Sequence, residues 1–313
     1  MKNFVRVCAI VCLGGLWWIA CGPADTRDNP TRGSIRIASD EAFHPVIEAL
    51  TEAYEGIYPK THFDVEYLPE QKAILALLQD SVRMVFVTRK LSPREEEMLI
   101  QQASTAKLHD IATDGIALIT SVQNTGALIT VSELEGIFKG EIRNWDQLAR
   151  GKGKGAISLV FDDANSSNLL YFSNRFGVTD FNNLKISVAG SHQKVVDYVK
   201  QNPGAIGFIG MNWISDGKEL STRELSENLY VVGVGQSNPG DSATRFYYPF
   251  QQDLGEGKYP LARELYAITR EAHPGLGGGL LTYIARDVGG LIIMKMGLVP
   301  RVPYQRDLIL KTE

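Results

Sequence analysis

The sequence predicts an α/β fold made of two lobes. Segments with the alternation of strands and segments with the 3.6-residue period of helices follow one another along the chain, which favours mostly parallel sheets flanked by helices. The 293 residues that follow a 20-residue export signal in this 313-residue chain are enough for two domains with cores of their own. A Gly-, Ser-, Asn- and Pro-rich stretch at 235–242 interrupts the pattern, and there we expect the chain to return to the first lobe.

An export signal accounts for residues 1–20. Basic residues precede an apolar stretch over 7–20, and Cys21 follows a small residue, as in the lipobox of bacterial lipoproteins. The stretch is short for the roughly 20 residues of a spanning helix, so we favour a cleaved lipoprotein signal over a transmembrane anchor. Cys8 and Cys12 lie in the signal, which leaves Cys21 for lipidation and no thiol for disulfides, metal or catalysis. We therefore predict an exported protein, lipid-anchored on the periplasmic or cell-surface face of a membrane.

The first lobe is expected at 34–114 and 245–313. Before it, residues 21–33 are rich in Pro, Asp, Asn, Thr and Gly and have little to bury, which predicts a flexible tether. Strand patterns lie at 34–38, 61–68, 83–88 and 265–269, and helical patterns lie at 45–54, 71–78, 93–104 and 277–296, the last as one long helix.

The second lobe is expected at 115–244. The apolar strand at 115–120 marks the crossing between the lobes, which we place near 112–120. Helical patterns follow at 131–138, 169–176 and 191–202, and strand patterns at 157–161, 205–209 and 229–234.

Three connections from a strand to a helix, at 39–42, 88–89 and 165–168, are candidate ligand contacts. Free backbone N–H groups and the positive end of a helix dipole meet at such places and favour an anion without a metal. Ser and Asn also cap helices for stability alone, so each loop taken singly has that alternative. The candidate ligand-binding residues are Asp40, Glu41, Ala42, Phe43, Glu70, Arg89, Ser166, Ser167 and Asn168.

The charged candidates have specific chemistry. Arg89 could bind two oxygens of an oxyanion, although an ion pair with Glu95 or Glu96 is the alternative. A carboxylate can accept the proton that hydrogen phosphate carries and sulfate lacks, and the candidates for this role are Asp40, Glu41 and Glu70. Each of these acids could instead be solvated or cap a helix.

No catalytic, metal or cofactor site is predicted. The glycine-rich run 275–279 lacks the Lys-Ser/Thr of a phosphate-binding loop. The mature chain has 30 basic and 36 acidic residues, which does not suggest nucleic acid as a partner. The five histidines show no pair at metal-ligand spacing; they are His44, His62, His109, His192 and His273.

Four ordered segments resemble the phosphate-binding proteins of bacterial ABC transporters. The resemblance implies a periplasmic-binding-protein (venus-flytrap) fold that closes on inorganic phosphate, is monomeric and delivers its ligand to a membrane permease without catalysis. The segments are ELEGIFKGEIRNWDQL (133–148), NPGAIGFIGMNW (202–213), YPLARELYAI (259–268) and IIMKMGLVP (292–300).

The ligand loops depart from the family pattern. Ser166-Ser167-Asn168 stands in place of a Ser-Gly-Thr triplet, and Asp162 falls where the family often has an arginine. The Gly-Ser of the family's second loop falls near Glu70, and Asp40 and Glu41 replace small hydroxyl residues. More acid in the pocket favours a protonated or less charged ligand. The alternatives are therefore a different small oxyanion or solute, a non-transport interaction protein with a degenerate pocket, or a surface phosphohydrolase.

Overall fold

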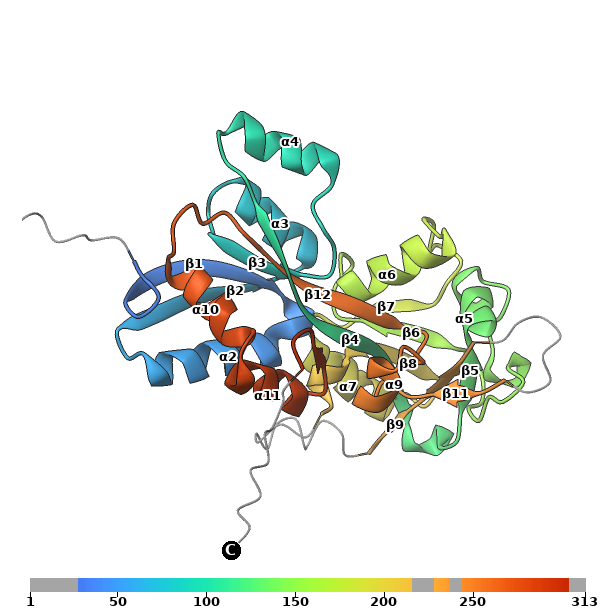
Figure 1. Ribbon diagram of the computed structural model, residues 1–313. Coiled ribbons are helices and arrows are strands. Elements are labelled where there is room, and N and C mark those ends of the chain that lie inside the picture. The colour runs from blue at the N-terminus through green and yellow to red at the C-terminus, as the bar shows by residue number, and fades with distance from the viewer. Residues whose placement is uncertain (1–27, 216–227, 237–243, 304–313) are drawn as a thin grey trace, which may run out of the picture.

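The computed structural model describes residues 28–215, 228–236 and 244–303 (Figure 1). The predicted signal, Cys21 and the beginning of the predicted tether lie outside these residues. The described chain forms a ten-stranded sheet in the order β2-β1-β3-β12-β4-β8-β6-β7, with β13 and β9 also paired to β4, and a small sheet in the order β11-β10-β5.

The first lobe is built on three parallel strands. β1 pairs with β2 on one side and β3 on the other, and β12 continues the sheet antiparallel to β3. In Figure 1, α3 and α4 cover one face and α2, α10 and α11 cover the other. The elements are β1 (Gly33–Asp40), a 3₁₀ helix (Glu41–Phe43), α2 (His44–Ile57), β2 (Thr61–Leu68), α3 (Glu70–Leu78), β3 (Met84–Val87), α4 (Pro93–Gln101), α10 (Leu276–Ile284), α11 (Asp287–Lys295) and β13 (Val299–Pro300).

The second lobe repeats this construction. β8 and β6 are parallel, as are β6 and β7. Helices α5 and α6 pack in one core and α7 in another on the opposite face. The elements are β5 (Leu128–Thr130), α5 (Val131–Phe138), β6 (Ser158–Phe161), α6 (Ser167–Phe176), β7 (Ile186–Val188), α7 (His192–Gln201), β8 (Ala205–Gly210), β9 (Leu229–Val231), β10 (Gly233–Gly235), β11 (Phe246–Tyr247), α9 (Gln251–Gly255) and short 3₁₀ helices at Val122–Asn124, Trp145–Gln147 and Met211–Trp213.

Two long antiparallel strands connect the lobes. β4 (Lys107–Ser121) pairs with β12 (Ala262–Thr269) in its first part and with β8 and β9 in its second part. Separate hydrophobic cores lie on either side of this pair. The predicted α/β class with two lobes is therefore confirmed. The division at 114/115 and 244/245 stays a prediction, although Leu254, Tyr259 and Leu261 pack in the second core and favour a later return to the first lobe.

The prediction of one long helix at 277–296 is wrong. The chain forms two helices there, α10 and α11, with a bend of 68° between Leu276–Ile284 and Val288–Lys295. Gly289 permits the bend: a Cβ atom there would lie 2.5 Å from the carbonyl oxygen of Tyr283. Only a residue without a side chain lets the second helix begin so close to the end of the first.

The last residues of the predicted tether make contacts with the first lobe. Asp28 forms an ion pair with Arg83 and accepts the N–H of Leu276 at 2.8 Å, and Tyr54 donates its hydroxyl to the carbonyl of Pro30. Residues 28–32 therefore belong to the folded lobe, and a tether that starts at Cys21 would have to end before Asp28.

Within the described residues, no single helix is long and apolar enough to cross a membrane. Taken together, the bent pair of α10 and α11 has the length and apolar composition of a membrane span. However, α10 buries Leu276, Leu280 and Ile284 in the core of the first lobe.

Candidate ligand site between the lobes

The loop after β1 contacts the second lobe directly. Asp40 ends β1, and the 3₁₀ helix Glu41–Phe43 follows. The carbonyl oxygen of Ala42 accepts hydrogen bonds from Nδ2 of Asn212 at 2.9 Å and from Nε1 of Trp213 at 3.0 Å. These are bonds between the lobes, so the predicted first loop lies at the lobe interface.

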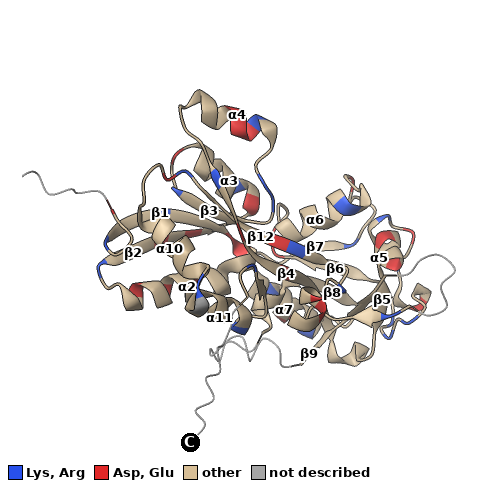
Figure 2. Cartoon of the chain, in the orientation of Figure 1, with Lys and Arg blue, Asp and Glu red and all other residues tan. Residues whose placement is uncertain are grey.

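Arg263, on the connecting strand β12, is the central cation of this interface. Its Nε donates to Oδ2 of Asp114 at 2.9 Å, and its Nη1 donates to Oγ of Ser167 at 3.0 Å. The side chain is 3% exposed, and Nη2 makes no hydrogen bond within the described protein although it lies 2.9 Å from Asp114 Oδ2. Figure 2 shows both charge signs where β12 passes between the lobes. A buried guanidinium that still has N–H groups available for hydrogen bonding is suited to bind an oxyanion.

Asp40 is a buried carboxyl group beside this arginine. It is 2% exposed; Oδ1 accepts the N–H of Ala42 at 3.3 Å, and Oδ2 has no hydrogen-bond partner in the described protein. Burial raises the pKa of Asp40 to about 7, with Arg263 opposing the shift and the charge of Glu70 adding to it. The group is therefore able to hold or release a proton near neutral pH.

Glu70, at the start of α3, fixes the loop that follows β3. Its Oε1 accepts the backbone N–H of Thr88 at 2.5 Å and the Thr88 hydroxyl at 2.6 Å. Glu70 is 3% exposed. Two hydrogen bonds to one carboxylate oxygen hold Thr88, so both donors of this residue point at Glu70.

Arg89, the predicted anion contact, is paired with an acid of its own lobe. Its Nη1 and Nη2 donate to Oε2 and Oε1 of Glu95 at 2.8 and 2.9 Å. The arginine holds the pKa of Glu95 down at about 2, against partial burial. Both terminal nitrogens of the guanidinium are therefore bonded within the first lobe. The ion pair with Glu95, which was the alternative to an anion contact, is formed.

The three polar residues that begin α6 are buried. Ser166 donates its hydroxyl to Oδ1 of Asp162 at 2.5 Å and accepts the N–H of Asn168 at 3.2 Å. Asn168 donates Nδ2 to the carbonyl of Phe208 at 3.1 Å, while its Oδ1 has no partner among the described residues. Ser166 is thus the helix cap, and Ser167 is the member of the triplet that contacts Arg263.

His192, at the start of α7, is fully buried at the interface. Its ring stacks on Trp213 with centroids 5.0 Å apart and an angle of 8°. Nδ1 lies 3.3 Å from Oε2 of Glu41, and Nε2 lies 3.8 Å from Oδ1 of Asp162. Burial lowers the pKa of His192, but the charges of Asp162 and Glu41 outweigh it and the net shift is upward.

Most predicted residues therefore meet at one interface. Arg263 was not predicted. Side chains alternate along its strand, and Arg263 lies on the same buried face as Leu261 and Leu265. A charged residue at such an apolar position could have indicated a functional role. The structure brings Asp40, Glu41, Ala42, Phe43, Glu70, Ser166, Ser167 and Asn168 together with Arg263, Asp114, Asp162, His192, Asn212 and Trp213.

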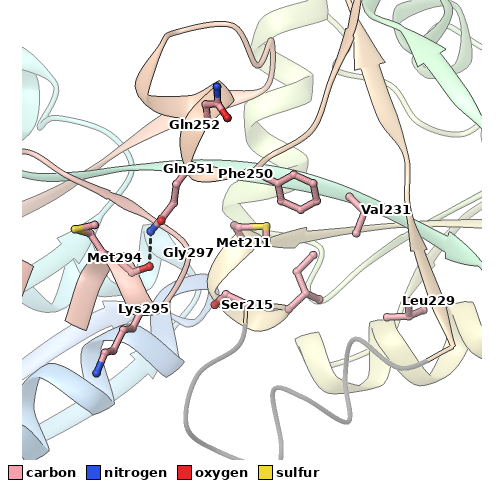
Figure 3. Close-up of a pocket in the computed structure, with 11 residues that line it drawn as sticks. Met211, Ser215, Leu229, Val231, Phe250, Gln251, Gln252, Met294, Lys295 and Gly297 are labelled. Carbon is pink, nitrogen blue, oxygen red and sulfur yellow. Dashed lines mark hydrogen bonds between the residues drawn. The ribbon is translucent and has the colours of Figure 1, made fainter. Parts of the chain in front are cut away.

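A separate cavity of about 640 Å³ opens beside this interface (Figure 3). Met211 and Ile214 of the second lobe line it, together with Phe250 and with Met294 of α11. None of the predicted ligand residues lines it, and its side chains are mainly apolar. We therefore do not place the anion there.

Known proteins share this architecture. The model of the PBP superfamily domain matches residues 24–288. Phosphate-binding protein PstS of Bacillus subtilis is 22% identical over 269 residues, which cover 86% of this chain and 81% of that protein. Phosphate-binding protein PstS 2 of Streptococcus pneumoniae is 26% identical over 116 residues, which cover 37% of this chain and only 38% of that protein.

Solved structures agree on the fold. A protein from Clostridium perfringens, assigned as a phosphate ABC transporter substrate-binding protein and solved with bound phosphate, has a TM-score of 0.69 at 22% identity, over 86% of this chain and 99% of that chain. An ABC-type phosphate transport receptor from Vibrio cholerae has a TM-score of 0.62 at 18% identity, over 85% and 99% of the two chains. With two lobes joined by β4 and β12 and a family match over most of its length, the chain belongs to the PBP superfamily.

Proposed function

We propose that this protein is an extracytoplasmic solute-binding protein that holds a small oxyanion, phosphate first, between its lobes and delivers it to an ABC permease. Export by the signal at 1–20 and lipidation at Cys21 would keep it at the membrane beside that permease. No catalysis is involved, and one chain is the working unit.

The observation that carries the proposal is the buried, incompletely bonded guanidinium of Arg263. It contacts Asp114 on the connecting strand and Ser167 in the second lobe. Among the described residues Nη2 makes no hydrogen bond of its own, although it lies 2.9 Å from Asp114 Oδ2. A ligand oxygen would give Nη2 an acceptor, and a charge-assisted bond of this kind is about twice as strong as a neutral one.

The acidic surroundings favour a ligand that carries hydrogens. Asp40 Oδ2 and Asn212 Oδ1 are buried acceptors without a hydrogen bond in the described protein. A P–OH group can donate to such an oxygen, which sulfate cannot do at neutral pH. Phosphate therefore suits the combination of one arginine and two free acceptors better than a fully deprotonated anion.

The bonds between the lobes supply the release step. Asn212 and Trp213 hold Ala42 across the interface, and both lobes continue into β4 and β12, which can flex as a hinge. Opening would break these bonds and expose the ligand to a permease.

One observation favours a second candidate, an interaction protein with a degenerate pocket. Several groups that could meet an anion are already bonded inside the protein: Thr88 to Glu70, Ser166 to Asp162, and Arg89 to Glu95. If closure needs no ligand, the closed form itself would be what a protein partner recognises.

Calorimetric titration distinguishes the two candidates. Protein from phosphate-depleted culture is titrated with phosphate and with sulfate at pH 6 to 8. Phosphate binding at one site, with sulfate binding weaker, supports the transport proposal. Absence of heat with both anions, for protein that unfolds cooperatively, refutes oxyanion binding and favours the interaction protein.

A further inference from the structure

A histidine lies between carboxylates from both lobes. His192 is fully buried, with Glu41 from the first lobe near Nδ1 and Asp162 from the second lobe near Nε2. One ring nitrogen and one oxygen from each acid lie within 4.8 Å of one another. Within residues 28–215, 228–236 and 244–303, this is the one group of three histidine, cysteine or acidic residues that meets that condition.

We propose that Glu41, Asp162 and His192 bind one divalent transition-metal cation, with Zn²⁺ preferred, across the lobe interface. An imidazole and two carboxylates are a donor set that zinc accepts, with a position left for water or another ligand. Metal–ligand bonds of about 2.0–2.2 Å put two ligands of a tetrahedral ion about 3.4 Å apart. The separation of 3.3 Å between His192 Nδ1 and Glu41 Oε2 already fits this value. Asp162 Oδ1 lies 3.8 Å from the other ring nitrogen, so its side chain has to move towards the ion to complete the set.

A residue in contact with His192 carries an unpartnered oxygen, which is a second observation in favour of a cation. Asn168 is fully buried, and its Nδ2 lies 3.4 Å from His192 Nε2. Its Oδ1 has no hydrogen bond among the described residues. Buried carbonyl oxygens are normally paired, and either a metal or a metal-bound water would pair this one.

The charge balance also favours a divalent ion. A protonated His192 brings one positive charge to two carboxylates, whereas a divalent ion bound to the neutral ring neutralises both. The ring is held in place by its stacking on Trp213, so it needs little reorganisation to bind.

Other histidine and acid pairs in the described chain lack these features. His62 and Glu55 are also 3.3 Å apart, but the His62 side chain is 67% exposed and no third ligand is near. His62 therefore serves as a matched control.

The site can be tested without phosphate and thus independently of the proposed function. Purified protein is stripped with a chelator and titrated with ZnCl₂ in a phosphate-free buffer by calorimetry. We expect one ion per chain, affinity about 100-fold weaker in His192→Ala and at least about tenfold weaker in Glu41→Gln, and no change in His62→Ala. Glu41 is partly exposed, so Glu41→Gln is expected to fold. This variant tests the site even if His192→Ala does not fold.

Co²⁺ provides a second readout, because its visible absorption reports ligand geometry. A bound Co²⁺ spectrum in the wild type that Glu41→Gln changes and His62→Ala does not would support the site. Absence of zinc binding, or zinc binding that Glu41→Gln and His192→Ala leave unchanged, would overturn it and leave the three residues as an ion-pair cluster.

Discussion

At the scale of single residues, the interface is governed by charges that burial makes strong. Asp40 and Asp114 are almost without solvent contact, and both have raised pKa values because burial disfavours their charged forms. Arg263 opposes both shifts. One arginine therefore limits the rise in pKa of two buried acids, and the proposed anion site depends on the same arginine.

Replacement of Asp40 by Asn should change the pH dependence of stability. The pKa of Asp40 is about 7 in the folded protein and about 3.9 when unfolded, so the folded state keeps a proton that the unfolded state loses. This stabilisation is complete below about pH 4 and is lost as the pH rises through 7. Relative to the wild type, Asp40→Asn should gain up to about 4 kcal/mol between pH 4 and 8, measured by urea unfolding. The exposed Asp64→Asn is the control, and parallel wild-type and Asp40→Asn curves would refute the shift.

Replacement of Arg89 by Ala should leave ligand affinity unchanged within about twofold. The guanidinium is bound to Glu95 and is 39% exposed, so its loss should cost about 1 kcal/mol or less of stability. Titration with phosphate and urea unfolding measure the two effects. A loss of affinity of tenfold or more would restore Arg89 to the ligand site.

Sequence patterns located loops that lie at the lobe interface but not the residues that these loops contact. The caps Asp40 and Ser166 follow strands, as predicted, because cap chemistry is local. Arg263 and His192 depend on contacts across 96 to 151 residues of chain, which periodicity does not encode.

At the scale of elements, local patterns were reliable where each element has one buried face. The strand at 61–68 and the helix at 131–138 have the predicted bounds. β4 is longer than predicted because its first part is exposed and carries polar residues, so its pattern resembled a loop. The three-residue strand β7 was missed because so short a segment has no readable period.

The N-terminus of α10 depends on acids brought from elsewhere. Asp28 accepts the N–H of Leu276, and Glu271 accepts those of Gly277 and Gly278 at 2.8 and 2.7 Å. These bonds satisfy donors that no helix can satisfy itself.

Asp28→Ala should therefore destabilise the protein by about 1–3 kcal/mol in urea unfolding. The pKa of Asp28 is lowered: burial raises it, but the hydrogen bonds and the charge of Arg83 outweigh burial. Its contribution is present above about pH 4 and is lost as the pH falls through the lower folded pKa. Asn29→Ala, which removes only an exposed turn contact, is the control. Equal stability of the two variants would show that Asp28 does not anchor the helix.

At the scale of the whole molecule, the two lobes meet through a few polar bonds on one side of the hinge strands. The Trp213 bond to Ala42 lies between the lobes, whereas the similar bond from Trp145 Nε1 to Gly204 O at 3.1 Å lies within the second lobe. Variants of these two tryptophans can therefore distinguish an effect on the closing of the lobes from an effect on the stability of the fold.

Trp213→Phe should shift the equilibrium towards open lobes. Loss of one hydrogen bond costs about 1 kcal/mol, which is about fivefold in the ratio of closed to open forms. Small-angle scattering without ligand should give a larger radius of gyration, and phosphate affinity should fall by a similar factor. Trp145→Phe should lower stability without either change. Unaltered scattering and affinity in Trp213→Phe would show that this bond does not hold the lobes closed.

Titration of two arginine variants with phosphate tests the central claim most directly. Arg263→Gln removes the interface cation. Arg270→Gln removes an arginine directly after the same strand, which donates to Ser104 and to the carbonyl of Leu77 instead. We expect wild-type and Arg270→Gln protein to bind phosphate alike, and folded Arg263→Gln to bind at least about 100-fold more weakly, because a buried charge-assisted contact is lost. Phosphate binding by Arg263→Gln at wild-type strength would contradict a ligand site built on Arg263.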